Sequence, residues 1–404
     1  MSTREREAAM SEPIVDQARR YDHFAPEFCV DPYTFWERLR TELPVGWSER
    51  HGGFHVVSRY RDVCQAEKDV ATFSSADGVG VPPMPVRLLP IDTDPPQHRA
   101  YRRILNPPLG PSEVAAREDE ARALAVELIE PLRQQAEFDL CAEFAVPFPQ
   151  RVSLRWIGFP DADRSDLAKW IDDITRLRGI DNDRVAAASV AVMTRIMELV
   201  GERRSAPPRP DLVGILIDGS IEGKPLSDDE ILFTMLLLLF GGLDTTSSAI
   251  AGAMAHLAEH PEQRRRLRDD PALLRTAVDE FLRYYSPVQG QGRTVTRDTT
   301  LGGCPLKAGD RVLLLLASGN RDETEFPDAD QVVLDRHPNP HVAFGHGPHH
   351  CVGAHLGRLM VQVALEELLG RLGDVRIADP TRLEWVGGET RGLRTLPLIQ
   401  DLPA

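Results

Sequence analysis

The stretch His341–Arg358, HVAFGHGPHHCVGAHLGR, decides how this chain is read, because it sets a single cysteine among glycines ahead of a helical pattern. A free cysteine is mostly protonated at neutral pH and needs help to exist as a thiolate. Glycines allow turns tight enough to aim backbone N–H groups at the sulfur, and a helix starting at Cys351 adds its positive end. The apolar residues that follow have helical spacing: Val352, Leu356, Leu359, Met360 and Val363. The stretch therefore predicts a thiolate at a helix N-terminus, held ready for a metal.

Histidines crowd the same region, so a zinc or nickel site is an alternative interpretation. They are His337, His341, His346, His349, His350 and His355. A closed zinc site usually combines several cysteines or regularly spaced histidines. This region offers one cysteine and an irregular set of histidines, which makes the alternative the weaker of the two.

Composition narrows the class of protein. A chain of 404 residues can bury a large core and enclose a cofactor. Its formal net charge of −15 argues against nucleic acid as the main partner. The five cysteines are scattered, which indicates a reducing compartment rather than a disulfide framework. The N-terminus lacks an apolar segment and the apolar run 231–243 is short for a membrane span, so we expect a cytoplasmic protein without a membrane anchor.

Local signals favour a mainly α fold with small β-sheets near both ends. Residues 1–20 are polar and are expected to form a flexible arm before one domain at 21–404. A short helix is expected over 32–43, followed by a hairpin of 46–50 and 54–58. Later strand-like segments are 294–298, 299–303, 311–317 and 393–399. Helical patterns punctuated by proline and glycine fill the rest.

A capping box at Ser227–Glu230 starts a long helical pattern that stops before His260. Its first half is apolar all round, so we expect it to be buried. Two glycines and an acid, in the run GGLDT at 241–245, interrupt it. These residues are unfavourable inside a buried helix, and such exceptions often mark function. The structural alternative is close helix packing at the glycines, with Asp244 paired to an arginine.

Two of these patterns resemble those of the cytochromes P450. The pattern Phe344-Gly345-x-Gly347-x-His349-x-Cys351-x-Gly353 looks like the haem-ligand loop of that family. The run LLLFGGLDTT at 237–246 is similar to its distal motif, especially in the camphor-hydroxylase branch. The resemblance covers about residue 21 to the C-terminus and implies a cytochrome P450 fold, one haem domain and haem b (iron protoporphyrin IX) as cofactor. Cys351 would be the axial metal ligand, and a thiolate in that position favours O–O cleavage.

The resemblance also implies roles for residues around the cofactor. Phe344 would pack beside the sulfur, and Gly241 would leave room for oxygen and water. Thr245 would relay protons and Asp244 would supply them. The haem propionates would meet His98, Arg102, Arg293 and His349, with Gln291 assisting. His98 and Arg102 are four residues apart, which places both on one helical face, although such a pair alone is usually a solvated face.

Further expectations concern stability and substrate. By resemblance, Glu280 and Arg283 form a buried pair that Arg336 completes, and this lock holds the cysteine loop. A surface salt bridge is the alternative for the pair alone. The proposed substrate contacts, from the loop 74–91, the distal helix, the segment after Pro287 and a C-terminal turn, are Val86, Leu237, Phe240, Val288 and Thr390. Arg87 and the polar turn 387–392 depart from the camphor-type pattern and put camphor itself in doubt.

Together these features imply a haem-thiolate monooxygenase that uses O2 and two electrons to hydroxylate or epoxidise a small hydrophobic substrate, such as a terpenoid or an aromatic compound. About fifty residues follow Cys351, so no fused reductase is expected. Electrons would come from an iron–sulfur ferredoxin with a flavin-dependent reductase, docking near Arg103 and Arg358 because such carriers are acidic. A peroxide-driven P450 and a non-catalytic haem-binding sensor are the alternatives, and the complete Asp244–Thr245 pair disfavours both.

Overall fold

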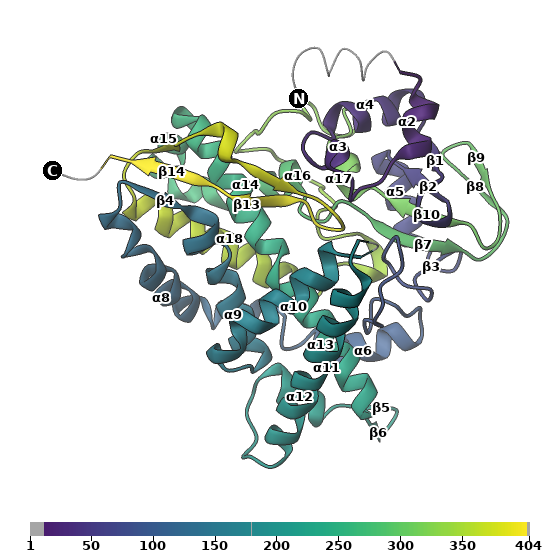
Figure 1. Cartoon of the computed structure of the whole chain (residues 1–404), viewed down its shortest axis with the longest axis horizontal. Helices are drawn as coiled ribbons and strands as arrows, with labels where there is room; N and C mark the ends of the chain where they lie inside the picture. The colour runs from purple at the N-terminus through teal and green to yellow at the C-terminus, as the bar shows by residue number, and fades with distance from the viewer. Residues whose placement is uncertain (1–11, 179, 402–404) are drawn as a thin grey trace.

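Helices make up most of the chain, and small sheets lie at its margins (Figure 1). The computed structural model describes residues 12–178 and 180–401. The first helices are α2 (Ile14–Arg20), α3 (Pro26–Cys29), α4 (Tyr33–Glu42), α5 (Tyr60–Lys68), α6 (Gln97–Leu105), α7 (Pro111–Ala115), α8 (Glu118–Ile129), α9 (Pro147–Ile157) and α10 (Arg164–Arg176). The later helices are α11 (Asn182–Arg204), α12 (Leu212–Ile217), α13 (Asp228–Leu243), α14 (Thr245–Glu259), α15 (Pro261–Asp269), α16 (Leu274–Tyr285), α17 (Leu316–Gly319) and α18 (Ala354–Arg371). The predicted mainly α fold is confirmed.

The largest described sheet has the strand order β1-β2-β10-β7-β3. Its strands are β1 (Val45–Ser48), β2 (Phe54–Val57), β10 (Arg311–Leu314), β7 (Gln291–Val295) and β3 (Phe73–Ser74). The predicted hairpin is present, because β1 and β2 pair antiparallel with Val45 opposite Val57. β10 runs parallel to β2 and antiparallel to β7, so distant parts of the sequence meet in this sheet.

Four smaller sheets are described. Two of them involve the C-terminal segment: one contains β4 (Glu137–Asp139), β11 (Val375–Ile377) and β14 (Pro397–Gln400), and the other pairs β12 (Glu384–Val386) with β13 (Gly392–Thr395). The other two are the pairs β5 (Ser220–Ile221) with β6 (Lys224–Pro225) and β8 (Thr299–Leu301) with β9 (Cys304–Leu306). An isolated bridge between Val288 and Thr390 ties the C-terminal turn to the segment after α16.

The N-terminal segment differs from the expected flexible arm where the structure describes it. Residues 14–20 form α2, whose Ile14 and Ala18 are buried with Trp36 and Leu39 of α4. Apolar residues spaced four apart explain this packing, since they lie on one helical face. Residues 1–11, the remainder of the expected arm apart from 12 and 13, lie outside the described residues.

The long helical pattern is two helices rather than one. Ser227 caps α13 through the predicted capping box, and the helix ends at Leu243. Asp244 has φ −123° and ψ −39°, and α14 continues from Thr245. The stretch Asp228–Glu259 is long and apolar enough to cross a membrane, but 61% of its most apolar window is buried inside the protein, as in a core helix. Figure 1 shows α13 and α14 passing through the middle of the molecule.

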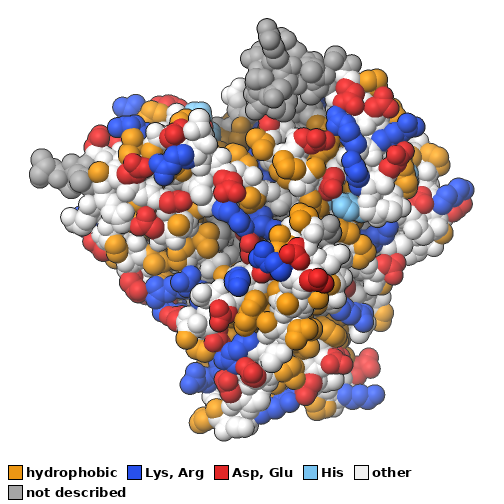
Figure 2. Space-filling model, viewed as in Figure 1, with side chains coloured by type: hydrophobic (Ala, Val, Ile, Leu, Met, Phe, Trp, Pro, Cys, Tyr) orange, Lys and Arg blue, Asp and Glu red, His pale blue; other side chains and the backbone are white. Residues whose placement is uncertain are grey.

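Charged side chains of both signs are mixed over the face of the molecule seen in Figure 2. Small groups of apolar side chains lie between them. The net charge of −15 is therefore distributed rather than gathered into one acidic patch on this face.

Candidate active site

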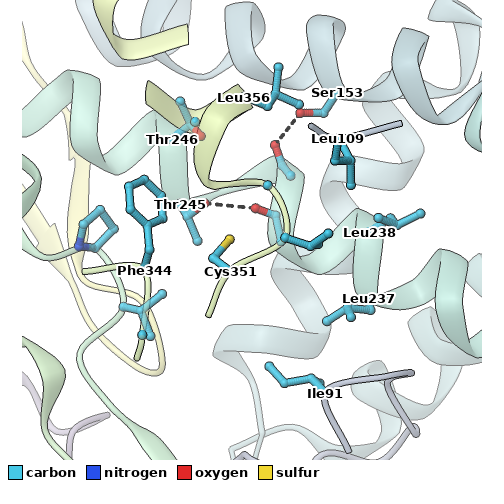
Figure 3. A pocket seen from close by; sticks show the side chains of 18 of the residues that line it. Ile91, Leu109, Ser153, Leu237, Leu238, Thr245, Thr246, Phe344, Cys351 and Leu356 are labelled. Atoms are coloured by element: carbon cyan, nitrogen blue, oxygen red, sulfur yellow. Dashed lines mark hydrogen bonds between the residues drawn. The ribbon is translucent and has the colours of Figure 1, made fainter. Parts of the chain in front are cut away.

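A cavity of about 250 Å³ lies between the α13/α14 pair and the loop that carries Cys351. Most of its lining is apolar and includes Ile91, Leu109, Trp156, Leu237, Leu238 and Val288. Figure 3 shows Cys351 and Thr245 near its centre, with Leu237 and Ile91 on one side. The cavity thus combines the Cys351 thiol, the hydroxyl groups of Ser153, Thr245 and Thr246, and a mostly apolar wall.

Glycines fold the cysteine loop against α5. Gly345 and Gly347 both have φ +70°, a left-handed conformation that other residues rarely adopt. A Cβ on Gly347 would also lie 2.7 Å from the backbone oxygen of Glu67. The Cys351 N–H donates to the Phe344 carbonyl at 2.8 Å, which closes the loop behind the sulfur. The helix expected at Cys351 begins three residues later, at Ala354, because Gly353 occupies the N-cap position.

The Cys351 thiol is accessible because it faces the cavity, although the cavity itself lies inside the protein. Burial raises the pKa of the thiol, while the Gly353 N–H and the guanidinium groups of Arg102 and Arg358 oppose that rise. Arg358 stacks over the Phe344 ring at 4.5 Å and donates to Asp279 at 2.6 Å. A metal cation bound at the sulfur would oppose this rise and stabilise the thiolate.

Imidazole and guanidinium groups gather at one edge of the cavity. His98, Arg102, Gln291 and His349 all line it. The His98 and His349 rings lie 4.1 Å apart, and the Nδ1 atoms of both are buried without a hydrogen-bond partner among the described residues. Burial is the main cause that lowers the pKa of His98 to about 4 and of His349 to about 3. These unpartnered donors, beside an accessible thiol, fit a flat cofactor with carboxylate groups at one edge, as haem has.

Arg293, expected to contact a propionate, occupies a different setting from the other donors. It is fully buried on β7, does not line the cavity, and forms an ion pair with Glu67 at 2.7 Å. Its Nε atom is buried without a partner among the described residues. The residue is therefore close to the donor group but is already held by a carboxylate.

The glycines and the threonine of the run 241–245 line the cavity. Gly241 and Thr245 line the cavity, and the Thr245 hydroxyl donates to the Gly241 carbonyl at 2.9 Å (Figure 3). A Cβ on Gly241 would meet nothing within 4 Å, so this position is open space. Gly242 also lines the cavity and packs on Ser153, whose hydroxyl donates to the Gly242 carbonyl at 3.0 Å.

Asp244 points to partners outside the cavity lining. Arg176 of α10 donates to both of its carboxylate oxygens, at 3.1 and 3.2 Å, and the Thr390 hydroxyl donates to Oδ2. Arg176 also pairs with Asp172 at 2.7 Å. The arginine pairing that the sequence left open is therefore present, and the side chain of Asp244 remains 29% exposed.

The expected substrate contacts divide into two groups. Leu237 and Val288 line the cavity, whereas Val86, Phe240 and Thr390 do not. Val86 is buried in the main core, because the loop 74–91 turns it inward; Phe240 packs against that core, and Thr390 is bound to Asp244. Arg87 is exposed, so the structure gives it no place on the cavity wall.

The polar turn 387–392 is occupied by structural contacts. Glu389 pairs with Arg178 at 2.6 Å, and Arg178 also donates to the Pro82 carbonyl at 2.9 Å. Arg391 donates to the carbonyl groups of Cys29 and Val30. These bonds hold the segment after α10, the loop 74–91, the end of α3 and the C-terminal turn together.

Glu280 is the centre of a buried ionic cluster. Arg283 donates to both carboxylate oxygens at 2.8 Å, and Arg336 donates to Oε2 at 3.0 Å. Val333 N–H and the Asn339 amide donate to the same carboxylate. A buried charge that is satisfied on all sides can be retained without a large penalty.

Asn320 connects this cluster to the cysteine loop. Arg283 donates to the Asn320 backbone carbonyl at 2.7 Å, and the Asn320 side-chain oxygen accepts the Val342 N–H at 2.7 Å. Its amide donates to Ser286 at 2.8 Å. The cluster thus reaches the chain nine residues before Cys351 through a single side chain.

The sequence did not reveal Arg176, Glu67 or Asn320. Each is an ordinary residue in its own helix or loop, and its partners lie far away in the sequence. Only tertiary packing brings them to the site. Charged residues such as Glu67 are rarely fully buried unless they are paired, so the sequence offered no reason to expect a buried carboxylate at this position.

The histidine-based metal site has no support in the described residues, where no group of three or more His, Cys, Asp or Glu side chains could hold a metal ion.

A family model described as Cytochrome P450 matches residues 183–373. Steroid C26-monooxygenase of Mycolicibacterium smegmatis is 36% identical over 345 residues, 84% of this chain and 85% of that protein. Cytochrome P450 130 of Mycobacterium tuberculosis is 36% identical over 379 residues, 89% of this chain and 92% of that protein.

Solved structures agree. CYP109E1 from Bacillus megaterium, in complex with testosterone, superposes with a TM-score of 0.86 at 29% identity and covers 93% of this chain and 100% of its own. CYP109Q5 from Chondromyces apiculatus gives 0.85 at 33% identity, covering 96% and 99%. With the thiol, the donor edge and the distal threonine in place, the chain belongs to the cytochrome P450 family and is a cytochrome P450 monooxygenase with haem b as its cofactor.

Proposed function

We propose that this enzyme inserts one oxygen atom from O2 into a small hydrophobic substrate, a terpenoid or an aromatic compound, by hydroxylation or epoxidation. The observation that carries the proposal is the apolar wall beside Thr245, formed by Leu237, Leu238, Val288 and Ile91. Such a wall binds by burial of apolar surface and leaves little to hold a charged molecule.

When bound, haem would supply the chemistry that cleaves the O–O bond, assisted by electron donation from a thiolate ligand. Cys351 would hold the iron. His98, Arg102 and His349 would bind the propionates, since charge-assisted hydrogen bonds to carboxylates are strong and directional. The apolar side chains exclude water from the cavity, which protects the reaction from side pathways.

Protons would enter through the distal helix. The Thr245 Oγ1 already donates to the Gly241 carbonyl, so its lone pairs remain free to accept a proton and pass one on. Asp244 would supply a proton to this hydroxyl, because its carboxylate is partly exposed to solvent and the residue directly precedes Thr245 in the chain. Arg176 and Thr390 would hold that carboxylate between turnovers.

Electrons would come from an iron–sulfur ferredoxin and its flavin-dependent reductase in the cytoplasm. The five cysteines are unpaired, which supports a reducing compartment. Arg103 is exposed on α6, the helix whose Arg102 contacts the cysteine loop at His350, so an acidic carrier could dock there. Arg358 is less suited, because it is committed to Asp279 and Phe344.

A steroid is the second candidate substrate. Relatives from Mycolicibacterium smegmatis and Mycobacterium tuberculosis are named Steroid C26-monooxygenase, and a solved structure of the same fold holds testosterone. A steroid also presents mainly apolar surface, so it matches the same lining. The two classes differ in size and can be separated by binding.

A titration with terpenoids, small aromatics and steroids tests the proposal, followed by turnover with a ferredoxin, its reductase and NADH. We expect members of one class to displace the water on the ferric haem, seen as a shift of the Soret band, and to give a product heavier by one oxygen atom. Failure of all three classes to shift the band would contradict the substrate proposal. Product formation with hydrogen peroxide but not with the ferredoxin pair would instead favour the peroxide-driven alternative.

A further inference from the structure

Glu67 is a buried carboxylate that the reaction outlined above does not use. It lies in the last turn of α5, and its side chain is 0% exposed. Its Oε1 atom is 2.7 Å from Nη2 of Arg293, which is also 0% exposed. Two opposite charges are thus fully withdrawn from water next to the cofactor cavity, where charge interactions are strong.

The second oxygen of Glu67 contacts the cysteine loop. Its Oε2 atom accepts the His346 N–H at 3.2 Å. The close approach continues along the loop, since a Cβ on Gly345 would lie 3.3 Å from the same oxygen. One carboxylate therefore joins β7 to the loop that presents Cys351, five residues further on.

The guanidinium of Arg293 is only partly satisfied by hydrogen bonds. Its Nη1 donates to the Gly292 carbonyl at 2.8 Å, and Nη2 also approaches the Gln291 side-chain oxygen at 3.3 Å. Its Nε is buried and has no partner in residues 12–178 and 180–401. Gln291 lines the cavity, and His349 lies close enough for the charge of Arg293 to affect it. The unpartnered Nε fits an acceptor that arrives with the cofactor.

We propose that Glu67 is a positioning residue for the edge of the cofactor that carries the propionates. It holds Arg293 and the backbone at His346 in one arrangement. Its negative charge also halves the positive charge that Arg102 and Arg293 together bring to the propionates. A buried guanidinium without a counter-charge is costly, so Glu67 keeps Arg293 in place before the cofactor binds. Once haem is bound, the negative charge of Glu67 opposes the addition of an electron. Glu67 therefore lowers the midpoint potential of the ferric/ferrous couple.

The test measures that potential for the wild-type holoenzyme, Glu67→Gln, Arg293→Gln and the double variant. Gln keeps the shape of Glu and an oxygen for the His346 N–H while removing the charge. We expect the midpoint potential of Glu67→Gln to be higher than that of wild type by about 59 mV. For a one-electron couple this is about a tenfold change in the equilibrium constant for reduction. The potential should fall in Arg293→Gln, and the double variant should return close to wild type. Glu367→Gln is the matched control and should leave the potential unchanged. It removes a carboxylate on α18 that is paired with Arg122 and Arg371 and does not line the cavity.

Opposite shifts that cancel in the double variant cannot arise from general loosening, which would move all three variants the same way. The proposal is overturned if Glu67→Gln has the wild-type potential, or if both single variants shift in one direction. Should Glu67→Gln not fold, the comparison moves to the Arg293→Gln background, where adding Glu67→Gln must raise the potential. The carbon monoxide difference spectrum of each sample reports the haem–thiolate bond separately, so a failure of the proposed ligand is distinguished from a failure of this proposal.

Discussion

Asp244 and Thr245 are neighbours in the chain but have different surroundings. Thr245 faces the cavity, while Asp244 is bound by Arg176 and Thr390 at the break between α13 and α14. The sequence singled out this place because two glycines and an acid are unfavourable in a buried helix, and the roles expected for the pair came from the resemblance to the P450 family. It could not predict the arginine, which comes from α10, 68 residues away.

Thr245→Ala should uncouple electron use from product formation. A positioned proton-transfer group contributes about 10²–10⁴-fold, so we expect product per NADH consumed to fall by about 10²-fold and hydrogen peroxide to rise. Thr245→Ser keeps a hydroxyl at the same place and should stay near wild type. Oxygen, peroxide and product balances measure this, and equal coupling in the two variants would exclude the relay role.

His256 should make stability depend on pH. It is buried on α14, with Nε2 3.0 Å from the Gln263 side-chain oxygen and with His260, Glu262 and Arg321 nearby. Burial is the main cause that lowers its pKa from 6.5 to about 4. The unfolded chain therefore binds more protons between these values, so the free energy of unfolding falls as pH drops from about 6.5 to about 4, by at most about 3 kcal/mol from this residue.

Urea titrations at pH 7 and pH 4.5 measure the effect. His256→Gln removes the titrating group and retains an amide that can bond Gln263, so its loss of stability on acidification should be smaller than that of wild type. An identical loss in both proteins would show that His256 does not titrate in this window.

At the scale of elements, local patterns predicted what local forces decide. The capping box, the hairpin and the cysteine loop follow from turn and cap chemistry within a few residues, and all three are present, although the helix after the cysteine begins at Ala354. The break of the long helix at Asp244 was not predicted, because helix propensity and apolar spacing continue on both sides. The helix at residues 14–20 was missed because its apolar face is short and gains its stability from α4.

Breaking the ionic cluster at the end of α16 should release the cysteine loop. Arg336→Ala removes one partner of the buried Glu280 and should cost about 3–5 kcal/mol of stability. We also expect a smaller thiolate-type band in the reduced carbon monoxide spectrum, since Asn320 transmits the disorder to Val342. Arg382→Ala, which removes an exposed pair with Glu137, is the control and should leave both measurements unchanged. A stable Arg336→Ala protein with a normal spectrum would contradict the lock.

At the scale of the whole molecule, the sequence predicted the fold class and the cofactor because its motifs stand in the order that the family requires. It did not predict which of the expected substrate contacts line the cavity. Val86 and Leu237 are similarly apolar, but tertiary packing buries Val86 in the core and leaves Leu237 on the cavity wall.

The docking face for the electron carrier can be tested by charge reversal. Arg103→Glu should lower ferredoxin-supported turnover, most strongly at low ionic strength, because it replaces an attraction to an acidic partner by repulsion. Chemical reduction by dithionite should be unaffected. Arg265→Glu on α15 makes the same charge change at another exposed arginine and should have little effect. Equal losses in both variants would point to net charge rather than to a docking site.

The central claim is that Cys351 is the thiolate ligand of haem iron, and one spectrum tests it directly. The dithionite-reduced protein is exposed to carbon monoxide, for wild type and for Cys351→Ser. We predict a strongly red-shifted Soret band in wild type that is lost in the variant. A wild-type haem spectrum without that shift, or a shift that survives in Cys351→Ser, would contradict the account.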